Sequence, residues 1–252
     1  MPHFRFIPLP YIMNRLRYIL ALTFITSFVF SAWAQKNKGG VNLPKFDYKA
    51  YHFGFLLSTN SADFTMTRKA DFTFNDSLLS IDNMRQPGFN LALLASLNIT
   101  KNVNIRFIPG LSFQDRALNY RFLEASGRIS ETPKRIESVY LDFPLLLKLR
   151  TNRAGNFAAY ALVGAKYSRD MQSQKDVNQN IEEELIVKLK DIDYSIDVGG
   201  GFDFFLTYFK FGIELKTGFG LPNVLLPETH KYSAPLNSLR TRTFVLSFTF
   251  EG

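Results

Sequence analysis

Apolar and polar residues alternate along residues 192–219, in two arms separated by Thr207 and Tyr208. The apolar positions of both arms are branched or aromatic. The polar positions carry carboxylates in the first arm, and lysines with a glutamate in the second. Alternation with a period of two predicts β-strands, and the short break predicts the turn of a hairpin. One face of this hairpin is therefore apolar and the other face is charged.

Six further segments repeat this alternation, which brings the predicted number of strands to eight. We place five of them at residues 51–59, 89–99, 103–113, 136–149 and 157–167, and the last one after residue 240. Long connections lie at residues 60–88, 114–135, 168–191 and 220–240, and short turns join the other strands. Long and short connections therefore alternate along the whole series.

An even number of strands with alternating long and short connections is typical of outer-membrane barrels. A soluble sandwich would bury its apolar face, but an apolar face on every strand is explained more simply by contact with lipid. The strand lengths suit the ~9–11 residues that a tilted strand needs to cross the hydrocarbon layer. We predict an all-β fold, an eight-stranded antiparallel transmembrane β-barrel of the OmpA/OmpX-like up-and-down kind, over residues 51–252.

Charged residues occupy many of the positions that face the predicted interior. Lipid offers no hydrogen-bond partners to an open sheet edge, so the barrel must close. A barrel of eight strands has an interior about wide enough for side chains to fill. Buried charges must then pair with one another. The predicted lumen network consists of Arg106, Asp142, Lys148, Asp193, Asp197, Asp203, Lys210, Glu214 and Lys216.

The N-terminal residues have the pattern of a secretory signal peptide. Arg15 and Arg17 precede an apolar stretch at residues 18–30, and Ala32-Trp33-Ala34 resembles a cleavage site. We predict that residues 1–34 are removed, with Met13 as an alternative start that would make residues 1–12 extraneous. Residues 35–50 are polar and basic, and we predict a periplasmic tether. The protein is then placed in the outer membrane with its long loops at the cell surface.

Composition narrows the classes of function further. The chain contains 26 phenylalanines and no cysteine, which excludes disulfides and thiolate metal sites. The formal net charge of +8 suits an anionic lipid surface. The basic residues are scattered and form no recognition module, so we predict no nucleic-acid partner.

No residue pattern indicates catalysis. His52 and His230 are the histidines that follow the predicted leader, and His230 lies near Glu228. A surface hydrolase or acyltransferase site at His230 is the alternative to a solvated loop histidine, which we favour because no Ser/His/Asp arrangement is evident. Residues 182–184 are glutamates, either a solvated acidic run or a surface cation site. We predict no catalytic residue, cofactor, resident metal or small-molecule substrate.

Two further features call for an interpretation. Gly199, Gly200 and Gly201 precede no helix, so they indicate a strand bend or close packing and not a phosphate loop. The fourth predicted loop is unusually apolar and either folds over the barrel mouth or forms an exposed patch for a partner. The residues of this candidate docking loop are Leu221, Pro222, Val224, Leu225 and Leu226.

The chain resembles the PorT family of outer-membrane proteins. The similarity is carried by residues 42–47 (NLPKFD), 52–55 (HFGF), 63–64 (DF), 76–81, 86–89 (QPGF) and 140–148 (YLDFPLLLK). The first block is the most specific, whereas the last one is common among related barrels. The resemblance implies a component of the type IX protein secretion system, which exports proteins across the outer membrane and in many members supports gliding motility. It implies no catalytic residues.

Three hypotheses of function follow. The first is a non-enzymatic barrel needed for type IX secretion that acts by contact with other translocon components and membrane lipid, including lipopolysaccharide. The second is a structural or adhesive OmpA/OmpX-like barrel without a secretion role. The third is an outer-membrane enzyme, which the shortage of histidine disfavours.

Overall fold

The computed structural model describes residues 40–69, 77–172 and 187–252. The chain separates into a unit of residues 1–41 and a unit of residues 42–252, and the second unit contains the whole sheet. The predicted signal peptide and the glutamates at residues 182–184 lie outside the described residues. Among the described residues, no helix has the length and apolar content needed to cross a membrane.

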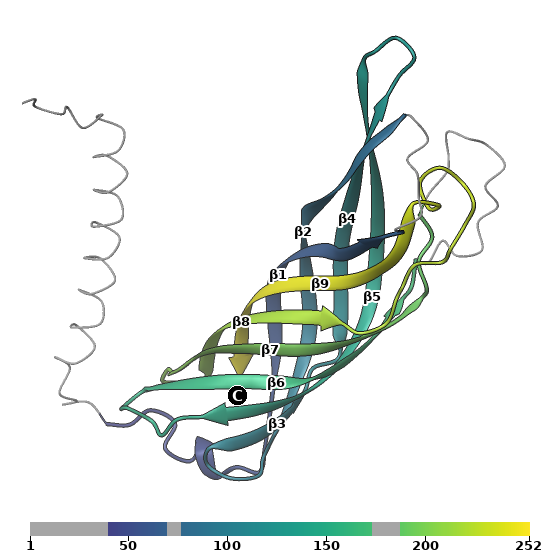
Figure 1. Ribbon diagram of the computed structural model, residues 1–252. Helices are drawn as coiled ribbons and strands as arrows, with labels where there is room; N and C mark the ends of the chain where they lie inside the picture. Colours follow the sequence, from purple (N-terminus) through teal and green to yellow (C-terminus); the bar gives the residue numbers. More distant parts are fainter. Residues whose placement is uncertain (1–39, 70–76, 173–186) are drawn as a thin grey trace, which may run out of the picture. The chain divides into compact units, whose positions relative to one another are not determined.

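The described residues form nine antiparallel strands in one sheet and a single short 3-10 turn (Figure 1). The elements are η1 (Phe46–Tyr48), β1 (Tyr51–Arg68), β2 (Leu78–Asn98), β3 (Val103–Phe107), β4 (Gly110–Leu123), β5 (Ile129–Arg150), β6 (Phe157–Asp170), β7 (Ile192–Phe205), β8 (Lys210–Gly220) and β9 (Leu236–Glu251). β9 pairs with β8 on one side and with β1 on the other, and β1 also pairs with β2. The sheet therefore closes on itself, and the predicted all-β antiparallel barrel class is confirmed.

The predicted count of eight strands was wrong by one, because the strand predicted at residues 103–113 is interrupted. β3 and β4 both lie between β2 and β5, so the nine strands occupy eight positions around the barrel. The break falls at Pro109, which has no backbone N–H to donate. Its carbonyl accepts the N–H of Leu93 at 2.9 Å, and the N–H of Ile108 donates to the carbonyl of Pro144 at 3.1 Å. These bonds continue the wall across the interruption.

Several strands continue well beyond the ends that the sequence predicted. Much of the predicted loops at residues 60–88 and 114–135 is strand, since β1 reaches Arg68, β2 begins at Leu78, and β4 and β5 leave only residues 124–128 between them. Most outer positions of these extensions are polar, and most inner positions are apolar. That is the pattern of a sheet in water. The prediction of strands required an apolar outer face, so these residues were predicted as loops.

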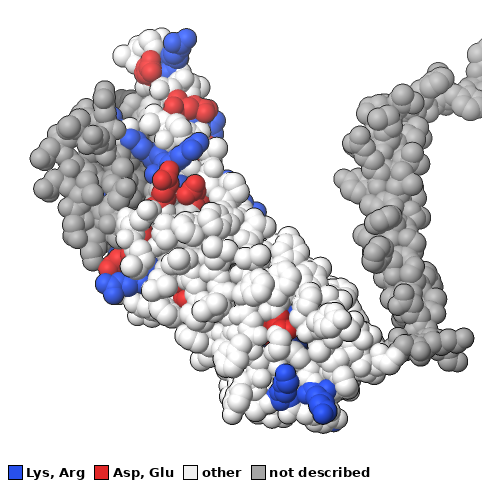
Figure 2. Space-filling view, turned by 180° about the vertical axis from the view of Figure 1, so that it is seen from behind, with Lys and Arg blue, Asp and Glu red and all other residues white. Residues whose placement is uncertain are grey.

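Exposed apolar side chains surround the part of the barrel nearer the short turns, and we call them the apolar belt. The belt consists of Phe53, Phe55, Leu57, Phe89, Leu91, Leu93, Leu97, Phe107, Leu111, Leu145, Leu147, Leu149, Phe157, Val163, Tyr194, Ile196, Val198, Phe202, Leu215, Phe219, Leu246 and Phe248. Figure 2 shows one face, on which charged residues gather toward the two ends and are sparse between them. Aromatic rings stack within the wall, as in Phe89 with Phe113 at 4.4 Å between centroids.

The strand extensions enclose a second apolar core beyond the belt, and we call this part of the molecule the head. The head comprises residues 62–68, 78–86, 114–138, 187–191 and 221–241. Its core consists of Phe64, Leu78, Ile81, Leu118, Tyr120, Val187, Leu189, Val224, Leu225, Tyr232, Leu236 and Leu239. The hydroxyl of Tyr120 donates to the backbone carbonyl of Tyr232 at 2.7 Å, so its polar atom has a partner. The head closes the end of the barrel that carries the long connections.

Candidate functional site

Arg106 lies at the centre of an ion network inside the barrel, with its side chain fully buried. Its Nη1 lies 3.0 Å from Oε2 of Glu214, and its Nη2 contacts Glu251. The hydroxyl of Tyr160 donates to the same Glu214 oxygen at 3.2 Å. Alternation along the strands turns these side chains inward, and the narrow interior brings them together.

Lysines surround this centre and supply the remaining carboxylates with partners. Lys148 Nζ lies 2.7 Å from Oδ2 of Asp203 and 3.6 Å from the ring centroid of Tyr160. Lys210 Nζ lies 2.7 Å from Glu251, and Lys216 Nζ lies 2.8 Å from Glu214. This half of the lumen is thus a continuous set of paired charges.

The other half of the lumen contains a looser polar cluster. Lys166 Nζ lies 3.6 Å from Asp142, Asp193 accepts a hydrogen bond from the hydroxyl of Thr241 at 2.5 Å, and Asp197 accepts one from Ser195 at 3.0 Å. Cavities of about 10 Å³ and 50 Å³ lie among these groups. The smaller one is about the size that a single water requires. The lumen of the described barrel is therefore filled with side chains.

The charges of these two clusters balance, with six cations and six anions among the described residues. The cations are Arg106, Arg116, Lys148, Lys166, Lys210 and Lys216, and the anions are Asp142, Asp193, Asp197, Asp203, Glu214 and Glu251. The structure places all nine residues of the predicted network in the lumen. Sequence reasoning missed Lys166 and Glu251, although both alternate with apolar residues in predicted strands. It missed Arg116 because that residue fell in a predicted loop.

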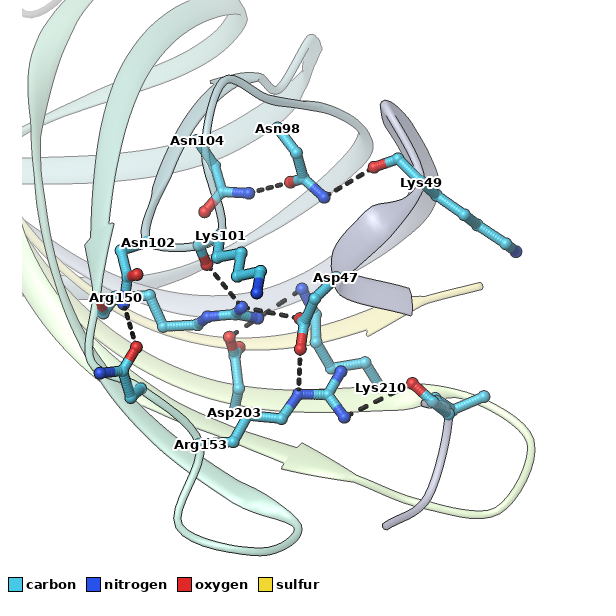
Figure 3. A network of polar contacts seen from close by, with 12 residues as sticks. Asp47, Lys49, Asn98, Lys101, Asn102, Asn104, Arg150, Arg153, Asp203 and Lys210 are labelled. Atoms are coloured by element: carbon cyan, nitrogen blue, oxygen red, sulfur yellow. Dashed lines mark hydrogen bonds and ion pairs between the residues drawn. The ribbon is translucent and has the colours of Figure 1, made fainter. Parts of the chain in front are cut away.

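The end of the barrel that carries the short turns is covered by residues 42–49, which we call the N-terminal cap (Figure 3). Both carboxylate oxygens of Asp47 form ion pairs, with Arg150 Nη2 and with Arg153 Nε, each at 2.7 Å. The side chain of Asn42 donates to the carbonyl of Phe205 at 3.0 Å, and Arg153 donates to the carbonyl of Asn42 at 2.9 Å. These residues were predicted as a tether, but they pack against the turns of the barrel.

An aromatic contact anchors the cap. The buried ring of Phe46 stacks on that of His52, with centroids 3.7 Å apart and planes at 3°, and contacts Phe205 edge-on at 6.0 Å. Lys210 Nζ lies 4.8 Å from the centroid of the Phe46 ring, which links the cap to the ion network. His52 is thus a packing residue at this end.

His230 has a structural environment in the head. Its Nδ1 accepts the backbone N–H of Tyr232 at 3.3 Å, so Nε2 carries the proton and donates to Glu228 at 2.8 Å. Glu228 also pairs with Lys188 at 3.0 Å. These hydrogen bonds indicate that His230 stabilises the turn in which it lies.

The candidate docking loop is divided between core and surface. Val224 and Leu225 are buried in the head core, whereas the side chain of Leu221 is 53% exposed. The N–H of Val224 donates to the carbonyl of Leu239 at 2.9 Å, and the N–H of Lys190 donates to the carbonyl of Val224 at 2.8 Å. This segment is hydrogen-bonded to both of its neighbours, and its buried leucine is not available to a partner.

The three glycines of β7 permit close packing of the lumen. A methyl group added at Gly201 would collide with the carbonyl oxygen of Ile213 and lie 2.7 Å from the hydroxyl of Tyr160. At Gly200, which faces the other way, the nearest atom would be the carbonyl oxygen of Tyr160 at 3.0 Å. Of the interpretations that the sequence left open, this geometry favours close packing.

We expect Gly201→Ala to destabilise the barrel by about 1–3 kcal/mol, the usual cost of overpacking a well-packed interior. Gly200→Ala is the matched control and should cost clearly less, because a small shift relieves its contact. Urea unfolding of both variants in lipid vesicles, followed by circular dichroism, measures the difference. Equal losses for the two variants would show that the glycines serve backbone flexibility and not space for Tyr160.

Among solved structures, the chain is similar to OprG of Pseudomonas aeruginosa, with 12% identity, a TM-score of 0.42, and coverage of 80% of this chain and 91% of that one. It is similar to Neisserial surface protein A, with 8% identity, a TM-score of 0.40, and coverage of 79% and 96%. For Ail of Yersinia pestis the identity is 11%, the TM-score 0.37, and the coverage 81% and 100%. No curated protein matches the chain significantly.

A family model covers more than three quarters of the chain. The model of the outer membrane protein beta-barrel domain matches residues 33–226, a range that includes the N-terminal cap, the predicted lumen residues and most of the strands. The closed antiparallel sheet and the apolar belt are the features expected of such a domain. The chain therefore belongs to the family of outer membrane protein beta-barrel domains.

Proposed function

We propose that this barrel is a non-enzymatic component of the type IX protein secretion system that acts through contacts with other translocon components. The support comes from the sequence block that most specifically resembles the PorT family. Residues 42–47 and 52–55 of that block lie together in the structure, where Phe46 stacks on His52 and Asp47 pairs with two arginines at the β5–β6 connection. The two segments of this block therefore form one structural unit at the capped end of the barrel.

The filled lumen supports an accessory role over that of a conduit. The ion network occupies one half of the interior, the head core closes one end and the N-terminal cap covers the other. Opening a passage for a protein would break buried ion pairs and displace both closures. Cargo therefore crosses the membrane through another component, and this barrel provides contact surfaces for the other translocon components. In this proposal the capped end faces the periplasm and the head faces the outside.

The proposal predicts a secretion defect when the gene is deleted. A cargo protein with the C-terminal export signal should accumulate unprocessed in the periplasm of the deletion strain, and plasmid-borne protein should restore its appearance in the medium. Immunoblots of periplasm and medium measure this, with a periplasmic enzyme as the control for leakage.

Normal export in the deletion strain would reject the secretion role. The protein would then be a structural or adhesive surface barrel, and the large head that projects beyond the belt is the feature that favours this second candidate (Figure 1). Attachment of the deletion strain to surfaces and to other cells would be the next measurement.

A further inference from the structure

The outward face of β9 changes abruptly from apolar to basic. Read from the short-turn end, it presents Phe248, Leu246 and Phe244, and then Arg242 and Arg240. Along a strand, two residues advance by about 7 Å, so both arginines lie just beyond the apolar belt. This is the depth at which lipid headgroups meet the wall of a membrane barrel.

Arg242 is joined there by a second arginine and a buried carboxylate. Asp63 on β1 faces outward, yet its side chain is only 2% exposed, because Arg242 and Arg85 cover it. Arg242 donates to Asp63 from Nε at 2.9 Å and from Nη2 at 2.7 Å, and Arg85 donates from Nε at 2.8 Å. The guanidinium carbons lie 5.7 Å and 4.7 Å from the centroid of the Phe244 ring.

This arrangement holds two guanidinium groups at fixed positions while leaving part of each exposed to the solvent or lipid. The side chains of Arg85 and Arg242 are 53% and 33% exposed. One carboxylate cannot neutralise two guanidiniums, so the cluster has a net positive charge. Arginine is well suited to phosphate because its planar fork donates two parallel hydrogen bonds.

We propose that Arg85 and Arg242, oriented by Asp63 above Phe244, bind a phosphate group of a membrane lipid. Phe244 supplies an apolar surface below the guanidiniums that continues into the belt, so the same lipid can place its acyl chains on the wall. Two kinds of lipid carry such a phosphate: lipid A in one leaflet and glycerophospholipid in the other.

The cluster also has a structural role from which lipid binding must be separated. The ladder between β1 and β2 ends at Ala62 and Gln86, and just beyond it the side chain of Asn83 donates to the carbonyl of Phe64 at 2.6 Å. Asp63 with its two arginines therefore ties β2 to β1 and β9 where the strands separate. If the cluster only held these strands together, replacing its arginines would not change the affinity for phosphorylated lipid.

The test uses the full barrel in detergent and native mass spectrometry with four lipids. These are bisphosphorylated lipid A, its dephosphorylated form, phosphatidylglycerol, and diacylglycerol as the phosphate-free counterpart of the phospholipid. For Arg85→Gln/Arg242→Gln we expect about a tenfold loss of affinity for a phosphorylated lipid, the order of one charge-assisted hydrogen bond, and no change for its phosphate-free counterpart. Loss confined to lipid A or to phosphatidylglycerol identifies the source.

The control is Arg121→Gln, which removes a similarly exposed outward arginine of the head that pairs with Asp82 at 2.7 Å. Equal binding by the double variant and the wild type, or equal losses with and without phosphate, would overturn the proposal. If the double variant does not fold, Arg85→Gln alone decides the question, since it leaves the bidentate pair of Arg242 with Asp63 intact.

Discussion

Replacing Arg106 by methionine is expected to lower the free energy of unfolding of the barrel by about 3–5 kcal/mol, the usual cost of removing one partner of a buried ion pair. Arg106 is fully buried between Glu214 and Glu251, whose side chains are also fully buried. The substitution leaves the carboxylates with the neighbouring lysines alone and makes the lumen net negative. Methionine has a similar volume, so the loss of stability reports the missing charge more than a cavity.

Unfolding in urea after reconstitution into lipid vesicles measures this effect. Circular dichroism is the suitable signal, because the single tryptophan, Trp33, lies in the predicted leader. Migration of unheated protein in detergent gels shows independently whether the barrel is folded.

Two controls separate the lumen charge from other causes. Arg121→Gln removes an exposed ion pair and should change stability by no more than about 1 kcal/mol. Arg106→Met/Glu214→Gln restores the balance of charges while Lys210 stays paired with Glu251, and it should regain part of the loss. A single variant no less stable than the surface control would contradict a network that depends on paired charges.

Replacing Leu225 by aspartate is expected to destabilise the head by more than the roughly 2–5 kcal/mol that truncating a buried leucine costs. Its side chain lies in the head core, and aspartate there adds the cost of burying a carboxylate to the loss of apolar contacts. The strands within the belt should remain paired, since lipid and the lumen network hold them. Limited proteolysis of the reconstituted protein should therefore cut the head and spare the barrel.

Leu221→Asp is the matched control, because it makes the same change in the same connection at a side chain that is 53% exposed. It should leave protease resistance unchanged. Similar resistance in both variants would show that the head core does not depend on this connection. A loss of complex formation with Leu221→Asp alone would place a partner contact at its exposed part.

The alternating pattern was sufficient to predict most of the membrane wall. Ile192 to Val198 on β7 and Leu246 to Phe250 on β9 alternate with small or polar residues, and contact with lipid favours such apolar faces independently of the rest of the chain. The positions of the inward charges followed from the same alternation. Their partners did not, because Arg106 meets residues more than 100 positions away in sequence.

The errors lie where the surroundings change from lipid to water. Beyond the belt the inner face of the strands is apolar and the outer face polar, so residues such as Tyr120 and Leu118 were assigned to loops and the head core was missed. The N-terminal cap was interpreted as a tether because Asn42 to Lys49 are mostly polar. The partners of Asp47 are Arg150 and Arg153 at the β5–β6 connection, which only the fold brings next to it.

The sequence by itself thus determined the class of fold, the lipid-facing wall and which charges point inward, because these depend on the local alternation of side chains along each strand. The tertiary structure decided which charges pair, that the cap and the head close the two ends, and that Arg85 and Arg242 share one carboxylate. Those features depend on strand register and closure, which bring distant residues within hydrogen-bonding distance.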